Sequence, residues 1–190
     1  RPNILAPHSG QELLFMLAAV GSYSSSVCLY LFSRSLWVEG QLQFDEGFLH
    51  EDEAFTLITF SQARRSMALS VCLFHRRVRA DSIMTSARSM RNVEGQIQAV
   101  ARIEAFSDSA SGLQLATRRL FRRRQRGMIR TAAHTAERVG GYPEYSALVR
   151  SRLGWKRLVA MDPLAVLYLG ASGLYFSLRR VFRRLLRRNG

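Results

Sequence analysis

The longest uncharged run of the chain lies near its N-terminus. Residues 13–33 contain no charged side chain over 21 positions. A helix rises about 1.5 Å per residue, so this run would extend roughly 30 Å, the thickness of a bilayer's hydrocarbon core. Tyr30 and Trp37, near its far end, carry rings that favour the membrane interface. The pattern predicts a transmembrane helix over 13–33.

The middle of this run is polar for a helix that faces lipid. Gly21, Ser22 and Ser25 are small and would let a second helix pack closely, so we predict helix-packing roles for them. A signal peptide fits poorly, because a basic leading region is missing and the apolar run is too long. A buried helix in a soluble core stays open as an alternative.

A second uncharged stretch, residues 163–178, follows Trp155-Lys156-Arg157. Starting at Pro163, a helix of 16 residues would reach only about 24 Å. Residues 158–162 would therefore also be embedded, and we expect a transmembrane or membrane-embedded helix over 158–178. Gly170 and Gly173 would give it a smooth packing face.

Asp162 immediately precedes this stretch and has two interpretations. With Pro163 it forms a common helix start, as N-cap and first helical residue. Inside a membrane, its carboxylate would instead be a proton or ion site. The sequence favours the helix start.

The tail, residues 179–190, alternates paired arginines with apolar residues. Continued as a helix, it would have one basic and one apolar face, which is typical of an interfacial helix on anionic lipid. We predict that seven arginines bind lipid headgroups. One precedes the second stretch and six are in the tail: Arg157, Arg179, Arg180, Arg183, Arg184, Arg187 and Arg188.

Helical patterns fill the rest of the chain. After an N-terminal segment (1–12) and the first span comes an acidic connector (34–53), and then a basic helical region (54–157). Within these parts, apolar spacing and capping signals predict helices over about 52–79, 81–106 and 113–139, and a short one closing near Gly154. A loop is expected over 107–112. The predicted fold class is all-α, an integral membrane protein with two spans.

Charge is divided unevenly along the chain. Residues 1–62 hold two basic and seven acidic residues, a net of −5, whereas residues 63–190 hold 26 and seven, a net of +19; together these give +14. Arginine supplies 27 of the 28 basic residues. Guanidinium groups bind phosphate with two hydrogen bonds, so the composition favours phospholipid headgroups, RNA or acidic proteins as partners.

Motifs for chemistry are missing from the sequence. The four histidines do not pair with cysteine or carboxylate at metal-ligand spacing, and no phosphate-binding glycine loop or nucleophile motif occurs. Cys28 and Cys72 lie in apolar segments, where we expect buried thiols without a disulfide. The sequence therefore predicts no enzyme, no metal and no cofactor other than a structural anionic phospholipid such as cardiolipin.

One arginine cluster in the basic region suits a partner surface or RNA. Six arginines and Phe121 fall within residues 118–126, and such a cluster could hold phosphates while the ring stacks on a base. The predicted partner-contacting residues are Arg118, Arg119, Arg122, Arg123, Arg124 and Arg126.

These features favour a structural accessory subunit of a mitochondrial inner-membrane complex, either ATP synthase or a respiratory-chain complex. It would scaffold neighbouring subunits and bind anionic lipid. Arg1 at the first position fits removal of an arginine-rich presequence. The alternative is an arginine-rich, RNA-contacting protein of the mitochondrial ribosome. Membrane orientation stays open. The basic tail favours the matrix side, but with two spans Arg150 and Arg152 would then lie on the intermembrane-space side, where basic residues are less expected.

Overall fold

The computed structural model describes residues 2–75, 77 and 87–162. In these ranges the chain is mostly helical, as the sequence predicts, with seven α-helices and one two-stranded sheet. The elements in chain order are β1 (Ile4–His8), α1 (Gly10–Ala19), the 3-10 turn η1 (Val27–Leu29), α2 (Arg34–Glu39), α3 (Glu51–Gln62), β2 (Ser66–Ala68), α4 (Met90–Ser109), α5 (Leu115–Val139), α6 (Tyr142–Arg152) and α7 (Trp155–Met161).

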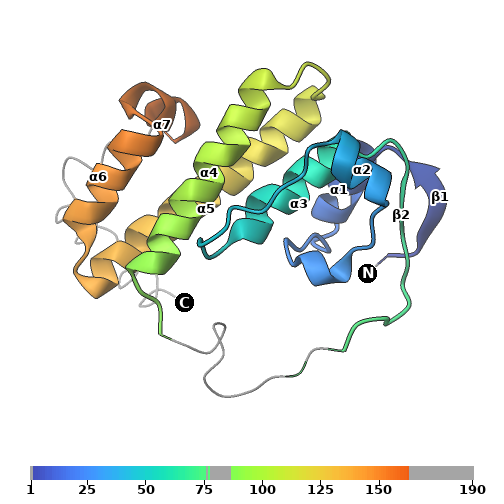
Figure 1. The fold of residues 1–190 in the computed structure, drawn as a ribbon, viewed down its shortest axis with the longest axis horizontal. Coiled ribbons are helices and arrows are strands. Elements are labelled where there is room, and N and C mark those ends of the chain that lie inside the picture. The colour runs from blue at the N-terminus through green and yellow to red at the C-terminus, as the bar shows by residue number, and fades with distance from the viewer. Residues whose placement is uncertain (1, 76, 78–86, 163–190) are drawn as a thin grey trace, which may run out of the picture.

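The long helices α4 and α5 lie side by side, with α3 and α1 packed on one side of this pair and α6 and α7 on the other (Figure 1). Helix α3 is enclosed on all sides over its middle, where every residue from Ala54 to Phe60 is buried. Its first turn holds three acids, Glu51, Asp52 and Glu53, which suit the positive end of the helix dipole.

The close approach of these helices depends on small residues. Ala132, Ala133 and Ala136 of α5 are fully buried. In α4, a Cβ on Gly95 would lie 1.9 Å from the carbonyl oxygen of Leu49, so the chain before α3 can touch α4 only at a glycine.

The prediction of one unbroken helix over 13–33 is wrong, because α1 ends at Ala19. Gly21 has a φ of +68° and reverses the chain. The N–H groups of Ser22 and Tyr23 then donate to the carbonyl of Leu17, at 2.8 and 3.1 Å. The serines that follow form a loop over α3. Within the described ranges, we find no helix long and apolar enough to cross a bilayer.

The helix predicted over 52–79 is also too long. It ends at Gln62, and Ala63 becomes extended and accepts a hydrogen bond from the Gly10 N–H. The chain then forms β2, which pairs antiparallel with β1 and places Ile4 opposite Ala68. The described residues after Gln62, up to His75, therefore form no further helix.

The helices of the basic region agree better with their predicted limits. Helix α5 ends at Val139, where Gly140 adopts a φ of +73°, and α6 closes just before Gly154. Helix α4 starts later than predicted, at Met90, and continues to Ser109 through part of the expected loop. The embedded helix predicted over 158–178 and the basic tail lie almost wholly outside the described residues; α7 accounts for 155–161.

Both cysteines are exposed, which corrects the expectation that they are buried. Cys28 lies in η1 and Cys72 in the extended chain after β2, and neither segment is part of a helix packed into the core. Their neighbours in sequence are apolar, but they run along the surface.

Candidate functional site

One face of α5 carries a line of five exposed arginines. They are Arg119, Arg122, Arg123, Arg126 and Arg130. The intervals of three, one, three and four residues place them on the same side of a helix. At about 1.5 Å per residue, the line is roughly 16 Å long. We call it the arginine face.

The arginine face exists because the opposite side of α5 is apolar. Phe121, Met128 and Ile129 are buried there, together with the three alanines Ala132, Ala133 and Ala136. Gln125 is the buried polar residue between them, and its amide donates to the Glu104 carboxylate at 3.1 Å. A helix with one such buried side must turn its remaining positions to solvent.

Two members of the arginine face hold the end of α7. Arg130 donates to both carboxylate oxygens of Asp162, at 2.8 and 3.2 Å, and Arg126 donates from Nε to the carbonyl of Met161. The Asp162 side chain is only 2% exposed. Removing a carboxylate from water is costly unless a partner offsets it, so this pair fixes the chain against α5 at the last described residue.

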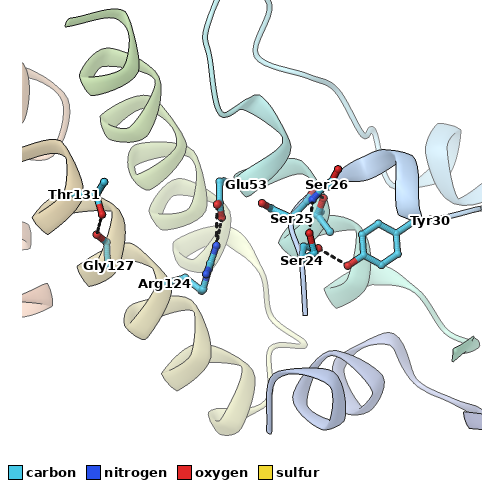
Figure 2. Close-up of polar contacts among 9 residues, drawn as sticks. Ser24, Ser25, Ser26, Tyr30, Glu53, Arg124, Gly127 and Thr131 are labelled. Carbon is cyan, nitrogen blue, oxygen red and sulfur yellow. Dashed lines mark hydrogen bonds and ion pairs between the residues drawn. The ribbon is translucent and has the colours of Figure 1, made fainter. Parts of the chain in front are cut away.

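Two other arginines of the predicted cluster turn away from the arginine face. Arg118 donates to the carbonyls of Ser107 and Ala110, at 2.9 and 3.0 Å, and so satisfies the end of α4. Arg124 donates to both oxygens of Glu53 on α3, at 2.6 and 2.8 Å, as Figure 2 shows. These two side chains hold helices together and are not available to a partner.

The contact between Arg124 and Glu53 lies in a partly buried setting. The Cζ atom of Arg124 lies over the Tyr23 ring, 5.4 Å from the ring centroid. Burial alone would lower the pKa of Arg124, but the charge of Glu53 and its hydrogen bonds raise it, so that the net shift is upward. Burial has the opposite effect on the Tyr23 hydroxyl, whose pKa it raises because it disfavours the charged phenolate. The cluster therefore keeps one fixed ion pair and a neutral phenol.

Among the described carboxylates, Asp52, beside Glu53, has the largest shift in pKa. Its pKa is raised to about 6, first by burial and then by the charges of Glu53 and Glu51. Three consecutive acids at one helix start repel one another, and Glu53 is the one of them that pairs with an arginine among the described residues.

Arg119, Arg122 and Arg123 are different from all of these. None of them makes a hydrogen bond or ion pair with another described residue. Helix α5 itself holds eight arginines and a single acid, Glu137, which lies two turns beyond Arg130. Within the part of the chain that the structure describes, these three side chains are therefore exposed, unpaired positive charges on α5.

The other predicted site residues are more scattered. Arg157 pairs with Asp108 at 2.8 Å on the surface. Gly21, Ser22 and Ser25 lie in the turn and loop after α1, not on a helix, and the carbonyl of Ser25 accepts a hydrogen bond from Thr56. Gly170, Gly173 and the six arginines of the tail lie outside the described residues.

Helical spacing alone could have separated the arginine face from Arg118 and Arg124, which fall on other sides of α5. No pattern in the sequence identifies the partners of Arg118 and Arg124. Glu53 and Arg124, for example, are 71 positions apart. Among the described residues, no group of three histidine, cysteine or acidic side chains could hold a metal ion.

Comparisons with protein-family models, with curated proteins and with solved structures found no match.

Proposed function

We propose that this protein is a structural subunit of a membrane complex that binds anionic phospholipid through the arginine face of α5. The observation that supports this most is the set Arg119, Arg122 and Arg123, which point outward without a described partner. Each arginine near an anionic lipid surface contributes about 1 kcal/mol of binding free energy.

The position of the arginine face favours lipid headgroups. Arg130 binds the Asp162 carboxylate and Arg126 donates to the Met161 carbonyl, and the sequence continues from Asp162 into the uncharged stretch 163–178. If that stretch enters a bilayer, headgroups surround its start. Arg123 and Arg122 lie about one helical turn from Arg126 and would then be at headgroup level.

The site of action in this proposal is the mitochondrial inner membrane, in ATP synthase or a respiratory-chain complex. Cardiolipin carries two phosphates, and paired guanidinium groups such as those of Arg122 and Arg123 suit two neighbouring phosphates. The role is scaffolding: α5 would be oriented against the membrane, and the helices packed on it would meet other subunits.

The competing function is an RNA contact in the mitochondrial ribosome. The same three arginines could bind RNA phosphates, and the open face of α5 is long enough to follow a backbone. The aromatic residue of the cluster does not assist, because Phe121 is buried in the core and cannot stack on a base. That observation favours lipid over RNA.

Flotation with vesicles tests this function. We expect the full chain to float with vesicles of phosphatidylcholine and cardiolipin, and not with phosphatidylcholine alone. Binding should weaken as salt is raised. Equal flotation with both vesicles would contradict the proposal, and so would tighter binding to polyadenylate RNA than to the cardiolipin vesicles at the same salt concentration.

A further inference from the structure

An apolar groove lies on the side of the molecule formed by α1, α3 and the β1–β2 sheet. It has a volume of about 920 Å³, which falls in the usual range for sites that bind small molecules. Two surface segments form its walls: residues 27–36, around η1, and residues 65–74, which include β2. Leu13, Leu17, Phe55 and Phe60, from α1 and α3, line its interior.

The groove collects exposed apolar side chains. Of the large apolar residues that are exposed in the described ranges, seven line it: Leu29, Leu31, Met67, Leu69, Val71, Leu73 and Phe74. Leu31 is 96% exposed and Leu73 is 69% exposed. A continuous apolar surface of this kind is unusual on a protein unless something covers it.

The two threonine hydroxyls that line the groove are already hydrogen-bonded. The Thr56 hydroxyl donates to the carbonyl of Ser25, and the Thr59 hydroxyl donates to the carbonyl of Phe55. A ligand inside the groove therefore meets methyl groups and rings, with few free donors. This favours a hydrocarbon chain over a sugar, a nucleotide or a polar peptide.

Charge is sparse along the groove. Among the described residues that line it, Arg65, which is exposed, is the one charged side chain, and none is a carboxylate. The neighbouring Arg64 is 90% exposed and lies 3.9 Å from Glu39, too loose a contact to neutralise it firmly. The groove thus pairs an apolar interior with a cationic mouth.

We propose that this groove binds an acyl chain of an anionic phospholipid whose phosphate lies against Arg65. A molecule with a hydrocarbon chain and one anionic end matches both parts of the groove. This inference extends the proposed function to a second site on the protein, and its test is chosen to succeed or fail independently of the arginine face.

Thiol labelling gives a direct test, because Cys28 and Cys72 both line the groove, are exposed, and are the only cysteines of the chain. The probe is monomeric lysophosphatidylglycerol, which needs no bilayer. We expect it to slow the reaction of both thiols with a polar maleimide by roughly tenfold, since a thiol must be reached to react. Monomeric lysophosphatidylcholine should slow the reaction much less.

Three results would overturn the proposal. They are unchanged labelling with the anionic lipid, equal protection by both lipids, and protection that appears without lipid as protein concentration rises. The last would identify a second copy of the chain as the occupant.

Variants separate this site from the arginine face. Leu31→Asp and Val71→Asp change side chains that are exposed, so the fold should survive while protection is lost. Arg119→Gln/Arg122→Gln/Arg123→Gln should retain the full protection. If the groove variants protect as well as the natural chain, the acyl-chain assignment is wrong, whatever the vesicle experiment gives.

Tryptophan quenching provides a second measurement. Trp37 stacks on Phe32 with ring centres 5.8 Å apart, and Phe32 lines the groove. In a Trp155→Phe variant, Trp37 is the only tryptophan. A lysophosphatidylglycerol with a brominated chain should quench its fluorescence, and lack of quenching at saturating lipid would contradict the proposal.

Discussion

The two sides of α5 use arginine for opposite purposes. On the side toward α3 and α4, Arg124 and Arg118 give their donors to Glu53 and to the end of α4. On the other side, Arg119, Arg122 and Arg123 have no described partner. Arg123 and Arg124 are consecutive in the sequence, yet one faces solvent and the other lies against Tyr23.

The difference shows that composition does not assign a role to an arginine. Position on the helix decides whether the guanidinium meets a carboxylate or water. The inward side should therefore control stability and the outward side should control binding. Variants on α5 can separate these two properties within one element.

The largest effect on stability is expected from the buried side. Ile129→Ala removes a fully buried side chain on the packed side of α5 and leaves a cavity. We expect a loss of about 2–4 kcal/mol of unfolding free energy and a fall in Tm of roughly 5–15 °C. Leu115→Ala on the same helix, where the side chain is 64% exposed, should change the free energy by less than about 0.5 kcal/mol. Equal losses would show that α5 is not packed as described.

The adjacent pair Arg123 and Arg124 sharpens the comparison. Arg124→Gln leaves the half-buried Glu53 carboxylate without its charged donor, which should cost about 1–3 kcal/mol. Arg123→Gln should be close to neutral in stability. Denaturant unfolding of the two variants measures both values, and similar losses would mean that the two arginines have the same role.

The acids at the start of α3 give a smaller, pH-dependent effect. The pKa of Asp52 is about 6 in the folded protein, above its usual value, so the folded state prefers the neutral carboxyl. Stability from this group is therefore highest below about pH 4 and is lost as pH rises through 6. Asp52→Asn should raise Tm by about 2–4 °C at pH 8 and change it little at pH 4. A constant difference across this range would contradict the shift.

Much of the helical region followed from the sequence. The limits of α5 were readable from its apolar spacing and from Gly140, and the acids at the start of α3 marked its first turn. The end of α1 could not be predicted from the sequence, because an uncharged run of 21 residues fits a single helix equally well. Gly21 and the serines after it break that run by making local turns and side-chain contacts with α3.

The candidate site was found only in part. The cluster at 118–126 was visible as a run of charge, but the run mixes arginines of both sides of α5. Which of them are exposed depends on Glu53, the Met161 carbonyl and the end of α4, and these contacts are set by packing between distant parts of the chain. The groove was missed because its walls were expected to be helices with buried thiols.

The central claim is that the outward arginines of α5 bind anionic lipid. The most direct measurement compares the affinity of two triple variants for vesicles of phosphatidylcholine and cardiolipin. The first is Arg119→Gln/Arg122→Gln/Arg123→Gln, and the second, with the same loss of charge, changes the exposed Arg88, Arg91 and Arg138 to Gln. We predict that the first variant binds about 10- to 100-fold more weakly than the natural chain, while the second loses less than about threefold. Equal losses in the two variants would contradict the account, because binding would then follow total charge and not the face of α5.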